Sequence, residues 1–128
     1  MINNLMLIDD DAIDQKLYRR IIQASGLVET LHQFEAADEA LDFLQQPDQI
    51  KMDAILLDIR MPCMDGFEFL EAATEKLGDN FVQAAVIMLT TSVSEEDMKR
   101  ARSFSVVRDY IDKPLTTEHI EMIDRMLV

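Results

Sequence analysis

The sequence predicts an α/β fold in which helices doubly wind a five-stranded parallel sheet in a (βα)5 order. Short apolar runs alternate with longer amphipathic stretches, and the best runs end abruptly at a polar residue. Runs without in/out alternation are typical of strands buried on both faces. Strands that alternate with helices imply right-handed crossovers, with helices on both faces of the sheet. The length of 128 residues is that of one domain.

Three apolar runs are the strongest strand candidates, at residues 5–8, 54–57 and 85–89. They stop at Asp9, Asp58 and Thr90 respectively. Buried helix segments can give similar runs, but the short lengths and the polar ends favour strands. Two weaker candidates lie at residues 28–34 and 106–111.

The first helix is predicted from apolar residues that recur every four positions. Gly26 is placed to end this helix. We expect its core-facing stripe to consist of Ile13, Leu17 and Ile21, widened by Tyr18 and Ile22.

Four further helices each begin near a residue that can accept a hydrogen bond from the first turn. These caps are Asp38, Asp65, Ser94, and either Thr116 or Thr117. The corresponding apolar stripes are Ala40, Leu41 and Leu44; Phe67, Leu70 and Ala73; Met98, Ala101 and Phe104; and Ile120, Ile123 and Leu127.

The composition excludes several classes of protein. The chain has 25 acidic and 12 basic residues, and its net charge of −13 argues against binding to nucleic acid or to an anionic membrane. One cysteine cannot form an internal disulfide, and no Cys or His cluster offers a zinc site. No apolar run approaches the roughly 20 residues that span a bilayer, and the start is unlike a signal peptide. We therefore expect one cytoplasmic domain over residues 1–128, with no output domain.

Acidic, hydroxyl and basic side chains follow the predicted strands. In an open α/β sheet, ligands bind at the carboxyl ends of the strands, where Asp9, Asp10, Asp58, Thr90 and Lys113 would meet. One such Asp is often only a turn former or a helix cap, but their convergence indicates a site. Two carboxylates about 4 Å apart repel by roughly 4 kcal/mol at an effective dielectric constant of 20. The acids therefore need a cation, and hard oxygen ligands favour Mg²⁺ over zinc.

Four motifs, in order along the chain, resemble the receiver domain of two-component response regulators, which has a flavodoxin-like fold. They are LIDDD at 7–11, LLDIRMPCMDG at 56–66, MLTT at 88–91 and DYIDKP at 109–114. The resemblance covers essentially the whole chain and fills the signature positions of the family. It implies a phosphoacceptor that works as a signalling switch and catalyses only its own phosphorylation and dephosphorylation.

The resemblance assigns the catalytic and metal-binding roles. Asp58 would accept a phosphoryl group from a sensor histidine kinase or a histidine phosphotransfer protein. Asp10, Asp58 and the backbone carbonyl of Arg60 would hold Mg²⁺, with Asp9 acting largely through water. Lys113 would contact the phosphoryl oxygens and the Asp58 carboxylate, and the family usually has a cis bond between Lys113 and Pro114.

The resemblance also implies a switch. Thr90 would donate its hydroxyl to the new phosphoryl group, and Tyr110 would change rotamer as Thr90 moves. The surface of the fourth helix, the fifth strand and the fifth helix would then change for a downstream protein. Tyr110 can equally be a half-buried strand aromatic with no switching role.

Gly66, after the acceptor strand, is expected to supply a backbone conformation that other residues resist.

Two other functions remain as alternatives. A Mg²⁺-dependent phosphohydrolase that forms an aspartyl phosphate usually has a second Asp two residues after the nucleophile, where this chain has Arg60. A pseudo-receiver would act only through protein contacts, although here the acids, the hydroxyl and the lysine are all present. We also expect Arg60 to tune dephosphorylation, either by shielding the acyl phosphate or by pairing with a nearby acid.

Overall fold

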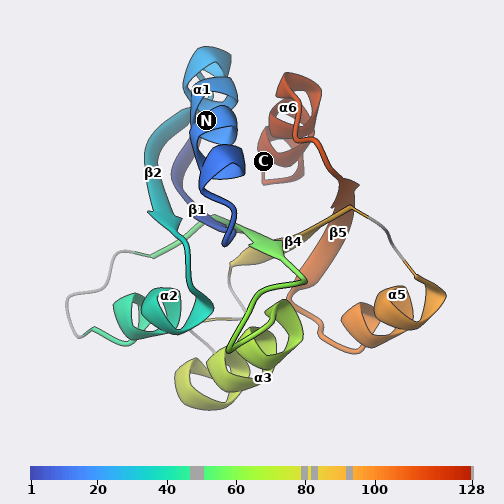
Figure 1. Ribbon diagram of the computed structural model, residues 1–128. Helices are drawn as coiled ribbons and strands as arrows, with labels where there is room; N and C mark the ends of the chain where they lie inside the picture. The colour runs from blue at the N-terminus through green and yellow to red at the C-terminus, as the bar shows by residue number, and fades with distance from the viewer. Residues whose placement is uncertain (47–50, 79–80, 82–83, 92–93, 128) are drawn as a thin grey trace.

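Five parallel strands form one sheet, as the sequence predicts, and their order is β2-β1-β3-β4-β5 (Figure 1). The structure is a computed structural model that describes all residues except 47–50, 79–80, 82–83, 92–93 and 128. The strand order reverses between β1 and β3, which is where open α/β sheets place their ligands. The strands are β1 (Ile2–Ile8), β2 (Val28–Phe34), β3 (Ala54–Asp58), β4 (Ala85–Thr90) and β5 (Val107–Asp112).

Helices cover both faces of the sheet, and the molecule therefore has three layers (Figure 1). One face carries α1 (Ala12–Ser25) and α6 (Thr117–Met126). The other carries α2 (Ala37–Leu44), α3 (Gly66–Leu77) and α5 (Glu95–Arg102). Within the described ranges, no helix is both long and apolar enough to cross a bilayer.

The central strands are apolar throughout because both of their faces are buried. On β1, Leu5 and Leu7 pack under α1 and α6, whereas Met6 and Ile8 point to the opposite core. On β3, Leu56 packs on the side of α1 and α6, whereas Leu57 packs in the opposite core. This alternation gives each strand two hydrophobic sides, and explains why the sequence shows continuous apolar runs.

The predicted caps are correct for three helices and wrong for one. The side chains of Asp65, Ser94 and Thr116 each accept a hydrogen bond from the first turn of α3, α5 and α6. The prediction of Asp38 for α2 is wrong, because Ala36 occupies the cap position and makes no side-chain hydrogen bond there. Asp38 lies inside the first turn, where the helix dipole favours a carboxylate.

The predicted core stripe of α1 is correct for Tyr18 and Ile22 but wrong for Ile13 and Leu17. Ile13 is 77 % exposed and Leu17 is 44 % exposed. The buried residues of α1 are Gln15, Tyr18 and Ile22. Gln15 can face the core because its side-chain amide donates to the backbone carbonyls of Asp9 and Phe34, which satisfies a polar group that would otherwise be costly to bury.

Candidate functional site

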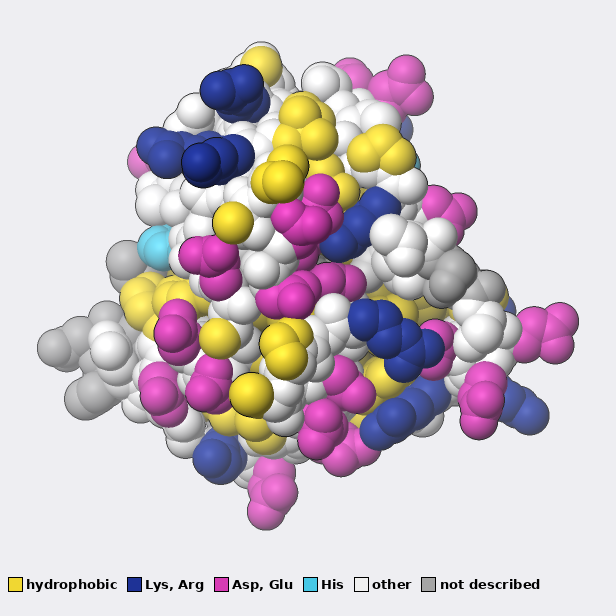
Figure 2. Space-filling view, viewed as in Figure 1, with side chains coloured by type: hydrophobic (Ala, Val, Ile, Leu, Met, Phe, Trp, Pro, Cys, Tyr) yellow, Lys and Arg dark blue, Asp and Glu magenta, His cyan; other side chains and the backbone are white. Residues whose placement is uncertain are grey.

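An acidic cleft lies at the carboxyl edge of the sheet. Figure 2, viewed as in Figure 1, shows acidic side chains in the middle of this face, between α1 and α3. The cleft has a volume of about 320 Å³. Its described lining comes from the ends of β1, β3, β4 and β5 and from α1, and consists of Asp10, Asp11, Asp14, Asp58, Arg60, Thr90, Thr91 and Lys113.

Strand register brings the predicted acids together. Ile8 of β1 pairs with Leu57 of β3, so Asp9 and Asp58, the residues that follow, end neighbouring strands. Asp9 is fully buried and Asp58 is 7 % exposed, whereas Asp10 is exposed to solvent. One carboxylate oxygen from each of these three residues lies within 4.8 Å of those from the other two.

Lys113 reaches into the same cluster from the end of β5. Its Nζ lies 2.9 Å from Asp9 Oδ2, 3.1 Å from Asp14 Oδ2 and 3.5 Å from Asp58 Oδ2. Its backbone N–H donates to the carbonyl of Thr90, and the bond from Lys113 to Pro114 is cis, as the resemblance implies. The lysine therefore contacts the Asp58 carboxylate, although its shortest ion pair is with Asp9.

Burial determines the electrostatics of the cluster. The pKa of Asp58 is raised to about 6, chiefly by desolvation and also by the nearby charge of Asp9, while Lys113 and the backbone N–H of Arg60 oppose the rise. Desolvation also raises the pKa of Asp9. Desolvation lowers the pKa of Lys113, but the hydrogen bond to Asp9 and the charge of Asp58 outweigh it and leave that pKa raised. Because Lys113 alone faces several carboxylates, it does not balance their charge, and the cleft keeps an excess of negative charge.

The donor set fits a magnesium ion. Asp9, Asp10 and Asp58 offer hard oxygen atoms close together, and Mg²⁺ needs few protein ligands because it keeps several waters. A divalent cation would offset the repulsion that Lys113 only partly relieves. Arg60 lines the cleft, and ligation through its carbonyl oxygen remains a prediction.

The two residues of the predicted switch lie on neighbouring strands. Thr90 ends β4, is 4 % exposed and lines the cleft. Tyr110 on β5 pairs in register with Met88 and is half-buried. Its hydroxyl donates to the backbone carbonyl of Met98 in α5 over 3.0 Å. The tyrosine thus connects the sheet to α5, and its rotamer change remains a prediction.

Gly66 is required for a different reason from the one expected. Its φ angle is not positive, so the prediction of an unusual backbone conformation is wrong. A Cβ atom at this position would lie 2.6 Å from the carbonyl oxygen of Asp58. Gly66 therefore allows the start of α3 to pack directly against the backbone of Asp58. The left-handed conformation in this loop belongs to Cys63, with φ 68°.

Three residues near the site were missed by the sequence analysis. Asp14 pairs with Lys113, Gln15 binds the backbone of Asp9, and Asp97 pairs with the guanidinium of Arg60. Asp14 lies one helical turn after Asp10, a spacing that could have indicated it. Gln15 and Asp97 have no local signal, because their partners depend on how the helices pack.

Comparisons with known proteins agree with this geometry. A family model described as "Response regulator receiver domain" matches residues 5–123. "Chemotaxis protein CheY" of Halobacterium salinarum is 32 % identical over 117 residues, which cover 89 % of this chain and 87 % of that protein. "Sensor histidine kinase CheAY" of Helicobacter pylori is 32 % identical over 93 % of this chain, which spans only 14 % of that kinase.

Solved structures share the fold. A two-component response regulator from Cytophaga hutchinsonii superposes with a TM-score of 0.89 at 25 % sequence identity, and the match covers 98 % of this chain and 96 % of that one. The family match includes the ends of β1, β3, β4 and β5, which build the acidic cleft. On the strength of this match and of the shared fold, the chain belongs to the response regulator receiver domain family.

Proposed function

We propose that the chain is a phosphoacceptor response regulator, in which Asp58 takes a phosphoryl group in a Mg²⁺-dependent reaction. The donor would be a phosphohistidine of a sensor histidine kinase or of a histidine phosphotransfer protein. The observation that carries the proposal is the position of Asp58, which is buried at the carboxyl edge within 3.5 Å of Lys113 and beside two further acids. We expect the protein to act as one domain in the cytoplasm, without binding nucleic acid or membrane.

The chemistry needs a nucleophile and positive charge, and the cleft offers both. An ionised Asp58 oxygen forms the new P–O bond, and the P–N bond of the phosphohistidine breaks with its electrons left on nitrogen. Because the other ring nitrogen of the donor histidine keeps its proton, the histidine is left as a neutral imidazole. Lys113 is placed to neutralise charge on the phosphoryl oxygens. A bound Mg²⁺, held by Asp10, Asp58 and the Arg60 carbonyl, with Asp9 acting through water, would supply the remaining positive charge.

Phosphorylation would then be signalled through Thr90 and Tyr110. The Thr90 hydroxyl would donate to the phosphoryl group, and Tyr110 would leave its contact with α5 and turn inward. The surface of α5, β5 and α6 would change for a downstream protein. In support, Thr90 lines the cleft and Tyr110 bonds to α5.

The alternatives are weaker. A phosphohydrolase of the aspartyl-phosphate type would need a second acid where Arg60 stands, and the guanidinium of Arg60 is paired with Asp97. A pseudo-receiver has no use for a buried acceptor carboxylate surrounded by two acids and a lysine. We therefore propose that the chain has no separate substrate and catalyses only its own phosphorylation and dephosphorylation.

The direct test is chemical. The purified protein is incubated with Mg²⁺ and acetyl phosphate, and its mass is measured before and after brief treatment with base. We expect one added phosphoryl group that base removes, because an acyl phosphate is base-labile.

Two controls locate the reaction. The Asp58→Asn variant keeps the size of the side chain but loses the nucleophile, and it should stay unmodified. EDTA, which removes Mg²⁺, should suppress the reaction of the protein without substitutions. No adduct, or an adduct that persists in Asp58→Asn, would overturn the proposal.

A further inference from the structure

Arg60 faces two parts of the molecule. It lines the acidic cleft, and its backbone N–H donates to the carboxylate of Asp58. Its guanidinium lies 2.7 Å from Asp97 Oδ2 in the first turn of α5. One residue therefore connects the cleft around Asp58 to α5, in which the paired acid Asp97 lies 37 residues further along the chain.

Helix α5 is held mainly by polar contacts. Ala101 is its only buried residue among those described. Besides the Arg60 ion pair, Arg100 pairs with Glu71 of α3 over 3.2 Å and lies 4.6 Å from the centre of the Phe67 ring. A helix with so little buried apolar surface depends on these contacts for its position.

The ion pair of Arg60 is weak enough to exchange. The Arg60 side chain is 70 % exposed, and ion pairs at such positions contribute about 0–1 kcal/mol. A phosphoryl dianion is a stronger partner, because guanidinium binds its oxygens through paired, charge-assisted hydrogen bonds. Asp97 is different, since its side chain is only 12 % exposed and loses its cation when Arg60 turns away.

We propose that the guanidinium of Arg60 breaks its ion pair with Asp97 and binds the phosphoryl group on Asp58 instead. This exchange releases the N-terminal turn of α5. This inference rests on the proposed phosphorylation of Asp58. It gives phosphorylation a second route to α5, separate from the hydrogen bond between Tyr110 and Met98. Arg60 thereby acts as a positioning residue for the phosphoryl group and as a latch on α5.

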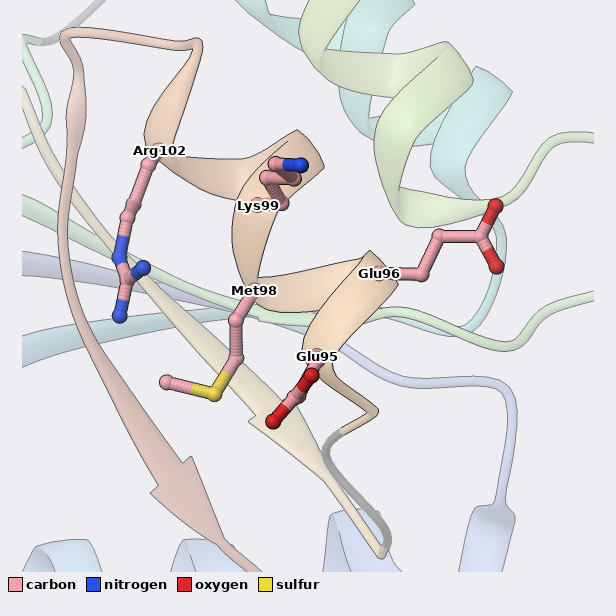
Figure 3. Close-up of a pocket in the computed structure, with 5 residues that line it drawn as sticks. All are labelled: Glu95, Glu96, Met98, Lys99 and Arg102. Atoms are coloured by element: carbon pink, nitrogen blue, oxygen red, sulfur yellow. The ribbon is translucent and has the colours of Figure 1, made fainter.

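The exchange would alter the outer surface of α5. A surface pocket of about 550 Å³ lies there, and its described lining consists of Glu95, Glu96, Met98, Lys99 and Arg102 (Figure 3). Figure 3 shows Glu95, Met98 and Arg102 projecting from one side of the helix, and Lys99 and Glu96 projecting elsewhere. Because Glu95 and Glu96 lie in the first turn of α5 and Lys99 and Arg102 in its last, release of the first turn would change the shape of this pocket.

Hydrogen exchange of α5, read by mass spectrometry, tests the release. In the protein without substitutions, phosphorylation with acetyl phosphate and Mg²⁺ should speed amide exchange at residues 95–98 several-fold. Asp97→Asn and Arg60→Gln break the ion pair beforehand, so their exchange should be fast already and should change little on phosphorylation. Arg100→Gln is the matched control, because it removes another ion pair of α5 that does not reach the cleft, and it should keep the response to phosphorylation.

Phosphorus NMR tests the new contact. The signal of the acyl phosphate should move in Arg60→Gln, stay in place in Asp97→Asn and return towards its original position in Arg60→Lys. If Arg60→Gln takes up no phosphoryl group, Asp97→Asn still decides the release, because it keeps Arg60 and should respond at residues 95–98 less than the protein without substitutions. An identical phosphorus signal with and without Arg60, or an unchanged response in Asp97→Asn, would overturn the exchange. The absence of any adduct on the unmodified sequence would instead overturn the proposed function.

Discussion

Lys113 Nζ donates a 2.9 Å hydrogen bond to the carboxylate of Asp9, a residue that solvent does not reach. The lysine side chain is itself only 10 % exposed. The pair joins the end of β5 to the end of β1 across the cleft, and Asp58, at the end of β3, lies between them in the sheet order. Lys113 therefore has a structural role in addition to the catalytic role proposed for it.

Replacing Lys113 by Met should destabilise the fold. Breaking a buried ion pair leaves an unpaired charge and costs about 3–5 kcal/mol, but the acids here can take up a proton, so we expect a loss of about 2–3 kcal/mol at pH 7. Urea unfolding measures this loss. Lys16→Ala, at an exposed position of α1, should change the free energy of unfolding little. An equally small effect of Lys113→Met would contradict the structural role of the pair.

Asp58 should make the metal-free protein less stable as the pH rises. Its pKa is about 6 in the folded state and 3.8 in the unfolded reference, so the folded state holds the proton more tightly. The contribution of Asp58 to the free energy of unfolding is then largest below pH 4 and is lost between pH 4 and pH 6. Asp58→Asn removes this loss, and should be about 1–3 kcal/mol more stable than the unmodified sequence at pH 7 but not at pH 3.5.

Magnesium offers an internal control for that prediction. Adding Mg²⁺ at pH 7 should raise the melting temperature of the unmodified sequence, because an ion that binds only the folded state stabilises it. The same addition should have a smaller effect on Asp58→Asn, which lacks one ligand. Equal shifts in both proteins would place the ion elsewhere.

The sheet and the main acids could be predicted from sequence because their signals are local. Leu56 and Leu57 must both be apolar when a strand is covered on both faces, and Asp58 follows them directly. Convergence of strand ends at one edge then follows from the parallel topology alone. No long-range contact needs to be known for this part of the site.

The face that α1 presents to the core could not be predicted in the same way. Gln15 is buried because its amide reaches the carbonyl of Phe34, 19 residues later, and Gln33 donates to its side chain. The partner of Asp14 is 99 residues away. Such contacts exist only after the helix has packed, so hydrophobic spacing wrongly favoured Ile13 and Leu17.

Replacing Gly66 by Ala should disturb the acceptor site. The added Cβ would lie 2.6 Å from the Asp58 carbonyl oxygen, so the backbone has to move. We expect a loss of about 2 kcal/mol or more in the free energy of unfolding, together with slower phosphorylation by acetyl phosphate. Gly26→Asn is the matched control, since Gly26 has a positive φ but open space around it, and should cost less than about 1 kcal/mol without slowing phosphorylation. Normal phosphorylation of Gly66→Ala would show that this close approach does not position Asp58.

Tyr110 should report phosphorylation, and Tyr18 should not. The chain has two tyrosines and no tryptophan, so labelling with 3-fluorotyrosine gives two fluorine signals, and Tyr110→Phe identifies which belongs to Tyr110. Tyr18 is 1 % exposed between α1 and the sheet, whereas the hydroxyl of Tyr110 is bonded to Met98 at the edge of α5. On phosphorylation the Tyr110 signal should move as its ring turns inward, and Thr90→Ala should abolish that movement while leaving Asp58 able to accept the phosphoryl group. A Tyr110 signal that stays fixed in fully phosphorylated protein would make this residue a half-buried strand aromatic, and would leave Arg60 as the proposed route from Asp58 to α5.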